Sequence, residues 1–308
     1  MRYTLRQLEI FAAIARSGSV SKAAEQVALS QSAASTALAE LERQFDCQLF
    51  DRHGKLLVLN ALGKSLLPAA SSLLTQAEEI EKLLEGKAAL GDLKLGATLT
   101  VGNYLGVLIV SEFMQRHTEC HIDLQVKNTQ SILQQLARYE LDLGLIEGSC
   151  HHPELVAEPW MDDELSVFCA PGHPLAKTSK PAIEDLVDAT WILREQGSGT
   201  RETFDHAMRH HSASLKVRLE LEHTEAIKRA VESGLGIGCI SRLALRDAFR
   251  RGSLVEIKTP MLDLKRQFLM VWHKNRYQTP AITSFLDYCR SLTTNLKTSD
   301  DVVLPPIA

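Results

Sequence analysis

Residues 18–43, GSVSKAAEQVALSQSAASTALAELER, contain two helical patterns separated by a break of a few residues. Ser21 and Ser30 are suited to cap the first and the second helix, because a serine hydroxyl accepts a hydrogen bond from a free backbone N–H. Two helices can cross closely only where small side chains meet. The faces expected to meet carry Ala23, Ala24 and Val27 in the first helix and Ala33, Ala34, Ala37, Leu38 and Leu41 in the second. The stretch predicts a helix-turn-helix.

The outward face of the second helix carries short polar side chains near its N-terminal end, namely Gln31, Ser32, Ser35 and Thr36. A glutamine can form two hydrogen bonds with an adenine edge, and a serine or threonine can bond a base or a phosphate. An ordinary helical hairpin would present a similar polar face to water. We predict a DNA-reading helix and keep the hairpin as the alternative.

The flanking sequence favours the DNA-binding interpretation. Residues 5–14 predict a helix that would cover the pair through Leu5, Leu8, Phe11 and Ala12. Residues 45–59 predict a short wing. Arg52 and Lys55 flank its turn, where DNA phosphates would lie.

Composition and charge are those of a globular protein. The 308 residues are 45% hydrophobic and carry a net charge of −4, which is enough chain for two or three domains. The first 65 residues hold eight Lys or Arg against six Asp or Glu, a net charge of +2, which leaves −6 for the remainder. No apolar run reaches the length of a membrane span and no signal-peptide pattern is present, so a cytoplasmic protein without a membrane partner is expected.

The six cysteines form no C-x-x-C pair, so we expect reduced, mostly buried thiols. Two clusters leave a metal or redox role open as an alternative, namely His117, Cys120 and His121, and Cys150, His151 and His152. Neither cluster has zinc-finger spacing, and no metal or cofactor is predicted.

Residues 66–86 form one long helical pattern with a seven-residue repeat. Asn60 is expected to cap the helix, and Pro68 is expected near its first turns, where a proline costs least. The apolar repeat positions are Leu66, Leu73 and Ile80, and Ala70, Ala77 and Leu84. An intermolecular coiled coil is predicted, with a helix packed on its own domain as the alternative.

From Asp92 onward strand and helix patterns alternate, which predicts an α/β domain with mostly parallel sheets. Three strand-to-helix junctions, at residues 97–100, 128–131 and 196–200, place hydroxyls and free backbone N–H groups at helix N-termini, where a small anion can bind. Ligands of open α/β sheets collect at this edge, so the three junctions together predict a ligand cleft. At any single junction these residues could instead simply cap a helix.

The N-terminal part resembles the LysR-type family of transcriptional regulators through LRQLEIFAAIARSGSVSKAAE (5–25), LSQSAAS (29–35) and LERQFDCQLFDR (41–52). Ser32 and Thr36 depart from the family pattern, which usually has Pro and often Arg there. The resemblance implies an all-α winged helix-turn-helix domain over residues 1–64 and a dimerising linker helix over 65–90. Together with the patterns above, the resemblance implies eight DNA-contact residues: Ser21, Ser30, Gln31, Ser32, Ser35, Thr36, Arg52 and Lys55.

The C-terminal part is similar to the effector-binding domain of this family through DLKLGATLTVGNYL (92–105), LDLGLIEG (141–148) and HTEAIKRAVESGLGIGCIS (223–241). The resemblance implies an α/β domain over residues 91–295 with two Rossmann-like subdomains, as in periplasmic binding proteins. Subdomain 1 would span about 91–162 and 267–295, and subdomain 2 about 163–266; residues 296–308 would be a loosely held tail. The implied effector contacts are Thr98, Thr100, Thr129, Ser198 and Thr200, with Glu147 facing the same cleft.

The resemblance is nearest to the YeiE-like and cysteine-regulator-like branch of the family, which implies a small sulfur compound as effector. A hydroxyl-lined pocket without an obligatory arginine suits a small oxyanion such as sulfite or sulfate. Glu147 disfavours a dianion unless the carboxyl or the ligand holds a proton, and Arg201 could supply positive charge. A small organic acid, or redox or metal sensing through the Cys/His clusters, remains the alternative.

Other protein classes explain less of the chain. Ser198 lacks the G-x-S-x-G context of a hydrolase, and Gly234-x-Gly236-x-Gly238 lies between a helix and a strand, the reverse of a dinucleotide motif. A solute-binding protein would leave the first 64 residues without a role. We therefore predict a regulator, not an enzyme, that binds double-stranded operator DNA as a homodimer or tetramer and responds to a small anionic effector.

Overall fold

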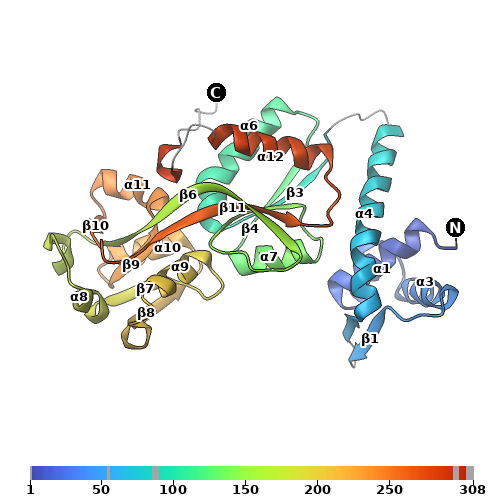
Figure 1. Cartoon of the computed structure of the whole chain (residues 1–308), viewed down its shortest axis with the longest axis horizontal. Coiled ribbons are helices and arrows are strands. Elements are labelled where there is room, and N and C mark those ends of the chain that lie inside the picture. Colours follow the sequence, from blue (N-terminus) through green and yellow to red (C-terminus); the bar gives the residue numbers. More distant parts are fainter. Residues whose placement is uncertain (1, 54–55, 85–89, 294–297, 303–308) are drawn as a thin grey trace.

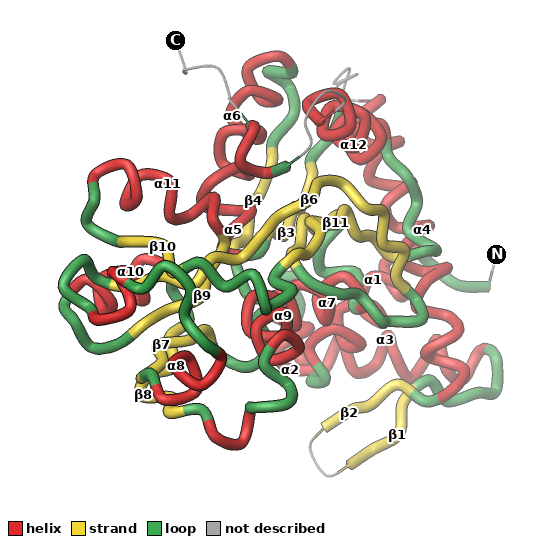
Figure 2. Tube along the Cα trace, turned by 60° about the vertical axis from the view of Figure 1, so that its left-hand side comes forward, coloured by secondary structure: helices red, strands yellow, loops and turns green. Residues whose placement is uncertain are grey.

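The computed structural model describes residues 2–53, 56–84, 90–293 and 298–302, and the bounds below refer to them. The N-terminal domain consists of three helices, a β-hairpin and one long helix. Its elements are α1 (Leu5–Ser17), α2 (Val20–Gln26), α3 (Gln31–Gln44), β1 (Phe50–His53), β2 (Leu56–Leu59) and α4 (Ala61–Leu84). Figure 2 shows the hairpin projecting beyond the helices at one end of the molecule.

Of the two predicted helix caps, Ser21 is wrong and Ser30 is confirmed. Gly18 adopts a left-handed φ of 64°, which ends α1 and leaves only Ser19 before α2 begins at Val20. Ser21 therefore lies inside α2 and does not cap it. Ser30 caps α3 as predicted, since its hydroxyl accepts a hydrogen bond from the Ala33 N–H at 3.2 Å.

The crossing of the helices depends on small buried side chains. The helix-turn-helix core contains Phe11, Ala12, Ala23, Ala24, Val27, Ala34, Leu38 and Leu41. Two predicted core residues, Leu5 and Ala33, are exposed instead. Leu5 is the first residue of α1, and Ala33 lies one position, about 100° of helical rotation, away from the buried Ala34.

Helix α4 begins earlier than the repeat predicted. Asn60 caps it, with its side-chain oxygen accepting from the Gly63 N–H at 2.9 Å. Pro68 therefore lies in the helix interior, where its ring removes one backbone hydrogen bond. The first half of α4 packs on the N-terminal core through Leu67 and Ala70, whereas Ile80 is 57% exposed.

The C-terminal domain has two halves built on one nine-stranded sheet. Eight of its strands follow the order β4-β3-β5-β11-β6-β9-β7-β8, and β10 pairs with β6. The strands are β3 (Leu93–Ala97), β4 (Ile122–Val126), β5 (Leu143–Glu147), β6 (Leu155–Cys169), β7 (Thr190–Arg194), β8 (Lys216–Leu221), β9 (Ile237–Ser241), β10 (Val255–Ile257) and β11 (Lys265–His273). We call the half with β3–β5 subdomain 1 and the half with β7–β10 subdomain 2. Each is parallel at its centre, as predicted.

Two long strands join the halves. Strand β6 pairs antiparallel with β11 from Leu155 to Glu164 and then with β9 from Leu165 to Phe168. Strand β11 also pairs antiparallel with β5. The long green-yellow and orange ribbons of β6 and β11 cross the middle of Figure 1 from one half to the other.

Helices cover the sheets of both halves (Figure 1). Subdomain 1 has α5 (Leu99–Val101), a π-helical turn (Gly102–Gly106), α6 (Val107–Arg116), α7 (Thr129–Ala137) and α12 (Pro280–Thr293). Subdomain 2 has α8 (Ile183–Asp188), α9 (Gly199–Ala207), α10 (Thr224–Glu232) and α11 (Arg242–Arg251). Short 3-10 turns cover Pro174–Lys177, Ser212–Ser214 and Ser299–Asp301.

The C-terminal segment differs from the loose tail that was predicted. Ser299 is 2% exposed and Val302 is 8% exposed, and Thr298 forms a parallel β-bridge with Asp162. The prediction was wrong for residues 298–302, because the Ser299 side chain bonds a buried carboxylate and the Val302 side chain fills an apolar gap. Residues 294–297 and 303–308 lie outside the described part of the chain.

The two domains touch through Tyr139, which belongs to the buried cluster of the N-terminal domain although it follows α7. Its hydroxyl bonds the buried His273 Nδ1 at 2.8 Å. None of the helices within the described ranges is long and apolar enough to cross a membrane.

Candidate functional site

The N-terminal end of α3 presents a polar surface. Gln31, Ser32, Ser35 and Thr36 are all exposed, and the Ser30 hydroxyl lies 3.0 Å from that of Ser32. Their side chains are therefore accessible to a groove-binding partner. Ser21 on α2 is also exposed.

The hairpin β1–β2 is fixed to the helices by its second strand, since the Leu57 N–H donates to the Gly18 carbonyl at 3.0 Å. Arg52 is exposed on β1, where a guanidinium can reach a phosphate. Lys55, also predicted as a phosphate contact, lies outside the described residues.

The three strand-to-helix junctions predicted from the sequence meet at the line between the subdomains. They belong to β3–α5 and β4–α7 in subdomain 1 and to β7–α9 in subdomain 2. The six predicted effector-contact residues are all buried, with exposed fractions of 1% to 4%: Thr98, Thr100, Thr129, Glu147, Ser198 and Thr200.

Glu147, the last residue of β5, is the centre of this cluster. Its carboxylate accepts hydrogen bonds from Thr98 Oγ1 at 2.8 Å and from Thr200 Oγ1 at 3.3 Å. Thr129 Oγ1 donates to the Glu147 carbonyl at 3.0 Å and accepts from the Gly199 N–H at 3.1 Å. Hydroxyls from both subdomains thus converge on one buried carboxylate.

Gly199 permits this close approach of the two subdomains. A Cβ at this position would lie 2.0 Å from the Glu147 carbonyl oxygen, so only a glycine fits here without a shift. The first turn of α9 therefore packs directly on the end of β5.

Two buried arginines, which the sequence prediction missed, supply positive charge to the cluster. Arg194 ends β7 and is 1% exposed, and its Nη1 lies 4.0 Å from Glu147 Oε1. Arg266 of β11 donates from Nη1 to Thr200 Oγ1 at 2.9 Å and from Nη2 to Thr100 Oγ1 at 3.5 Å. The hydroxyl-lined pocket was expected without an obligatory arginine, and the structure places two arginines beside it.

Arg194 carried a sequence signal, because it ends an apolar strand immediately before the predicted 196–200 junction. Arg266 had no such signal in the sequence, because the position of this residue in the cluster depends on the register of β11 against β6. Arg201, considered from the sequence as a source of charge, is engaged elsewhere: its guanidinium pairs with Asp205 and Glu220 at 2.8 and 2.9 Å. Those two ion pairs hold the group away from Glu147.

Two polar atoms of the cluster have no hydrogen-bond partner among the described residues, namely Arg194 Nη1 and Ser198 Oγ. The other two nitrogens of that guanidinium, Nε and Nη2, donate to Glu195 at 2.8 and 3.0 Å. A buried donor without a partner is costly, so a ligand that accepts from these atoms would stabilise the closed arrangement.

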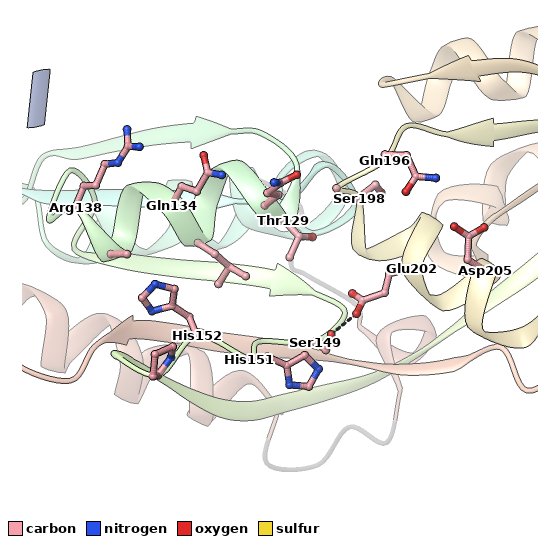
Figure 3. Close-up of a pocket in the computed structure, with 15 residues that line it drawn as sticks. Thr129, Gln134, Arg138, Ser149, His151, His152, Gln196, Ser198, Glu202 and Asp205 are labelled. Atoms are coloured by element: carbon pink, nitrogen blue, oxygen red, sulfur yellow. Dashed lines mark hydrogen bonds between the residues drawn. The ribbon is translucent and has the colours of Figure 1, made fainter. Parts of the chain in front are cut away.

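An open groove of about 770 Å³ adjoins the cluster at Thr129 and Ser198. Figure 3 shows it between α7, the loop after β5 and the first turns of α9, with Arg138, His151 and His152 along its walls. A hydrogen bond from Ser149 to Glu202 crosses its floor. The groove is large enough to extend a ligand beyond the buried hydroxyls.

The cysteine and histidine clusters do not form a metal site in the described ranges, where no three His, Cys, Asp or Glu side chains are grouped suitably. Four of the six cysteines are buried, as predicted. Burial raises the pKa of Cys169 to about 11 and that of Cys239 to about 12, so these thiols stay protonated and unreactive near neutral pH.

Comparison with known proteins assigns the family. The profile described as bacterial regulatory helix-turn-helix protein, lysR family, matches residues 5–64, and the LysR substrate binding domain profile matches residues 87–293. The chain is a LysR-type transcriptional regulator. It binds DNA through its N-terminal helix-turn-helix and carries a C-terminal effector-binding domain.

Named relatives agree with the predicted branch. The regulator is 43% identical over 289 residues to the uncharacterized HTH-type transcriptional regulator YeiE of Escherichia coli K12. This match covers 94% of this chain and 98% of the relative. It is 30% identical over 262 residues to the HTH-type transcriptional regulator CysL of Bacillus subtilis, covering 84% and 88%. The expected likeness to YeiE-like and cysteine-regulator-like proteins is confirmed, and these relatives are regulators rather than enzymes.

Among solved structures, the regulator is similar to the Synechocystis CcmR regulatory domain in complex with 2-PG. The TM-score is 0.63 at 30% identity, and the match covers 68% of this chain and all of that domain. The two-subdomain α/β fold of the effector-binding domain is therefore that of a ligand-binding regulator.

Proposed function

We propose that this regulator senses a small oxyanion, such as sulfite or sulfate, bound between its two C-terminal subdomains. The observation that carries the proposal is the pair of buried, unpartnered donors Arg194 Nη1 and Ser198 Oγ. An oxyanion has several lone pairs and can accept from a guanidinium N–H and from a hydroxyl. The hydroxyls of Thr98, Thr100, Thr129 and Thr200 would complete its surroundings.

The charges around the cluster favour an anion that keeps a proton. Arg194 and Arg266 face Glu147, each 4.0 Å from the same carboxylate oxygen. A fully charged dianion would repel that carboxylate, whereas hydrogensulfite can place its proton between the two groups. We therefore favour sulfite over sulfate.

A small organic acid is the second candidate. The groove of about 770 Å³ beside Thr129 and Ser198 supports it, because it offers room for a carbon chain attached to an anionic head. The relative solved with 2-PG supports a ligand of this size class as well.

The DNA side of the proposal uses the exposed polar face of α3. Gln31, Ser32, Ser35 and Thr36 would contact base edges, while Ser21, Ser30, Arg52 and Lys55 would contact phosphates of double-stranded operator DNA. In the cytoplasm, α4 would join two copies into a homodimer, and two such dimers would form a tetramer. The exposed Ile80 and the 83% exposed Leu84 support this pairing.

Calorimetric titration of the full-length protein with sulfite, sulfate and a panel of small carboxylates tests the effector. We expect binding of sulfite that is weakened at least tenfold by Thr98→Ala and by Ser198→Ala, since each removes one hydroxyl of the cleft. The control Ser233→Ala, in the turn after α10, should bind as the wild type does. Equal sulfite affinity in all three variants would refute the placement of the ligand.

A further inference from the structure

The C-terminal segment 298–302 is attached to both halves of the effector-binding domain. Val302 is buried in the core of subdomain 1, and its carbonyl accepts from Arg246 Nη1 of α11 at 3.5 Å. Thr298 bridges to Asp162 on β6, the strand that runs through both halves. Figure 1 shows this last red turn beside α11. Its contacts on α11 and on β6 both lie far from it in the sequence.

Ser299 joins the segment to a buried carboxylate. Asp163, which is 3% exposed on β6, accepts at Oδ1 from Ser299 Oγ at 2.6 Å and from Ser241 Oγ at 2.7 Å. At Oδ2 it accepts from Arg266 Nε at 2.7 Å. The three donors come from three different parts of the chain. The Asp163 carboxylate therefore connects β9, β11 and the C-terminal segment.

Arg266 connects Asp163 to the proposed effector cleft. With Nε held by Asp163, its Nη1 and Nη2 reach Thr200 of subdomain 2 and Thr100 of subdomain 1. The guanidinium can make both contacts only when the two subdomains are close together. Its orientation, and thus the charge offered to an anion, depends on how firmly Asp163 is fixed.

We infer that residues 298–302 form a strap whose Ser299 hydroxyl fixes Asp163 and thereby positions Arg266 for anion binding. The inference rests on the proposed effector cleft. Ser299 touches no ligand itself: it is a positioning residue that acts through Asp163. Loss of its hydroxyl leaves Asp163 Oδ1 with a single donor, and Arg266 is then held less firmly between Thr100 and Thr200.

Calorimetry on full-length Ser299→Ala, with sulfite as the probe, tests the strap. We expect sulfite affinity to fall about tenfold, the size expected for one hydrogen bond to a charged group. The matched control is Ser291→Ala, because the Ser291 hydroxyl bonds only the Tyr288 carbonyl of α12. A chain that ends at Val302 is the second control; both controls should bind as the wild type does. Unchanged affinity in Ser299→Ala would overturn the inference.

A ligand-free measurement separates this inference from the proposed function. The Nε–H resonance of Arg266, assigned by its loss in Arg266→Lys, reports the bond to Asp163 directly. In Ser299→Ala we expect this resonance to shift and its proton to exchange faster, with no change in Ser291→Ala. If wild-type protein binds no small anion, the oxyanion proposal fails, yet this shift still supports the strap. An unchanged resonance rules the strap out.

Discussion

The polar side chains at the start of α3 are the residues that we propose contact DNA bases. Four polar residues there are exposed, and none of them carries a charge. With these contacts, sequence preference would come from short hydrogen bonds, and affinity would come from phosphate contacts made elsewhere.

Replacing Gln31 or Ser35 by alanine should weaken binding to selected genomic fragments without unfolding the protein. A two-pronged contact to a base contributes about 1–3 kcal/mol of discrimination, so Gln31→Ala should cost about tenfold or more. Fluorescence anisotropy at fixed salt, on selected and on random DNA, measures the difference. Ala39→Ser, on an exposed position of the same helix, is the control. An equal loss on both kinds of DNA would mean that Gln31 contacts only the backbone.

Gly199 is the residue that lets the subdomains close. Gly199→Ala would place a methyl group against the Glu147 carbonyl, and overpacking of this kind costs about 1–3 kcal/mol. We expect a lower unfolding temperature and no further rise with sulfite, as measured by thermal shift. Gly172→Ala is the matched control, because a Cβ there meets nothing within 4 Å. A normal sulfite response in Gly199→Ala would show that closure at this point is not required.

At the scale of elements, the loop after α7 and the end of β11 connect the two domains. The Asn275 backbone N–H donates to His273 Nδ1 at 3.1 Å, so this nitrogen is an acceptor and the Tyr139 hydroxyl must donate to it. Burial lowers the pKa of His273, and the neutral ring is the form that fits. Protonation would place a hydrogen on Nδ1, which abolishes the hydrogen bond from the Asn275 N–H and forces the Tyr139 hydroxyl to accept instead of donate.

This contact predicts a pH dependence. Because the pKa of His273 is lower in the folded chain than its ordinary value of 6.5, its contribution to stability is present above pH 6.5. The contribution is lost as the pH falls through the lowered pKa. Unfolding temperatures measured from pH 8 to pH 5 should fall more steeply in the wild type than in His273→Asn. Parallel curves would show that the ring titrates without affecting the fold.

At the scale of the whole molecule, α4 carries apolar surface that its own chain leaves uncovered. Its first half packs on the N-terminal core, and its second half exposes Ile80 and Leu84. The first half of α4 therefore follows the alternative of a helix packed on its own domain, and the coiled coil stays a prediction for the second half. A second copy of the chain is the partner that would cover the exposed part.

Ile80→Glu should weaken self-association, because it places a charge in the contact that two α4 helices would share. Light scattering after size-exclusion chromatography should show a smaller species at equal protein concentration. Glu81→Gln, at the neighbouring exposed position, should leave the mass unchanged. An unchanged mass in Ile80→Glu would place the interface elsewhere.

The features predictable from sequence were the local ones. Helical periodicity located the helix-turn-helix, and hydroxyls following strand ends located Thr98, Thr129 and Ser198, since the carboxyl edge of a sheet gathers them. The features missed depend on long-range register. Arg266 reaches the cleft only through the pairing of β11 with β6, and Ser299 reaches Asp163 across more than 130 residues of chain. The start of α2 at Val20 was missed because Gly18 ends α1 so abruptly.

The burial of the hydroxyl cluster has a kinetic consequence. With Thr98, Glu147 and Thr200 each only 1% exposed, a ligand that binds at the proposed site cannot reach it directly from solution. The subdomains must first separate, and association then proceeds no faster than that opening. As ligand concentration rises, the observed rate reaches a plateau set by the protein. At high ligand concentration, the delay between a change in the cell and a change in transcription would then be limited by how often this domain opens.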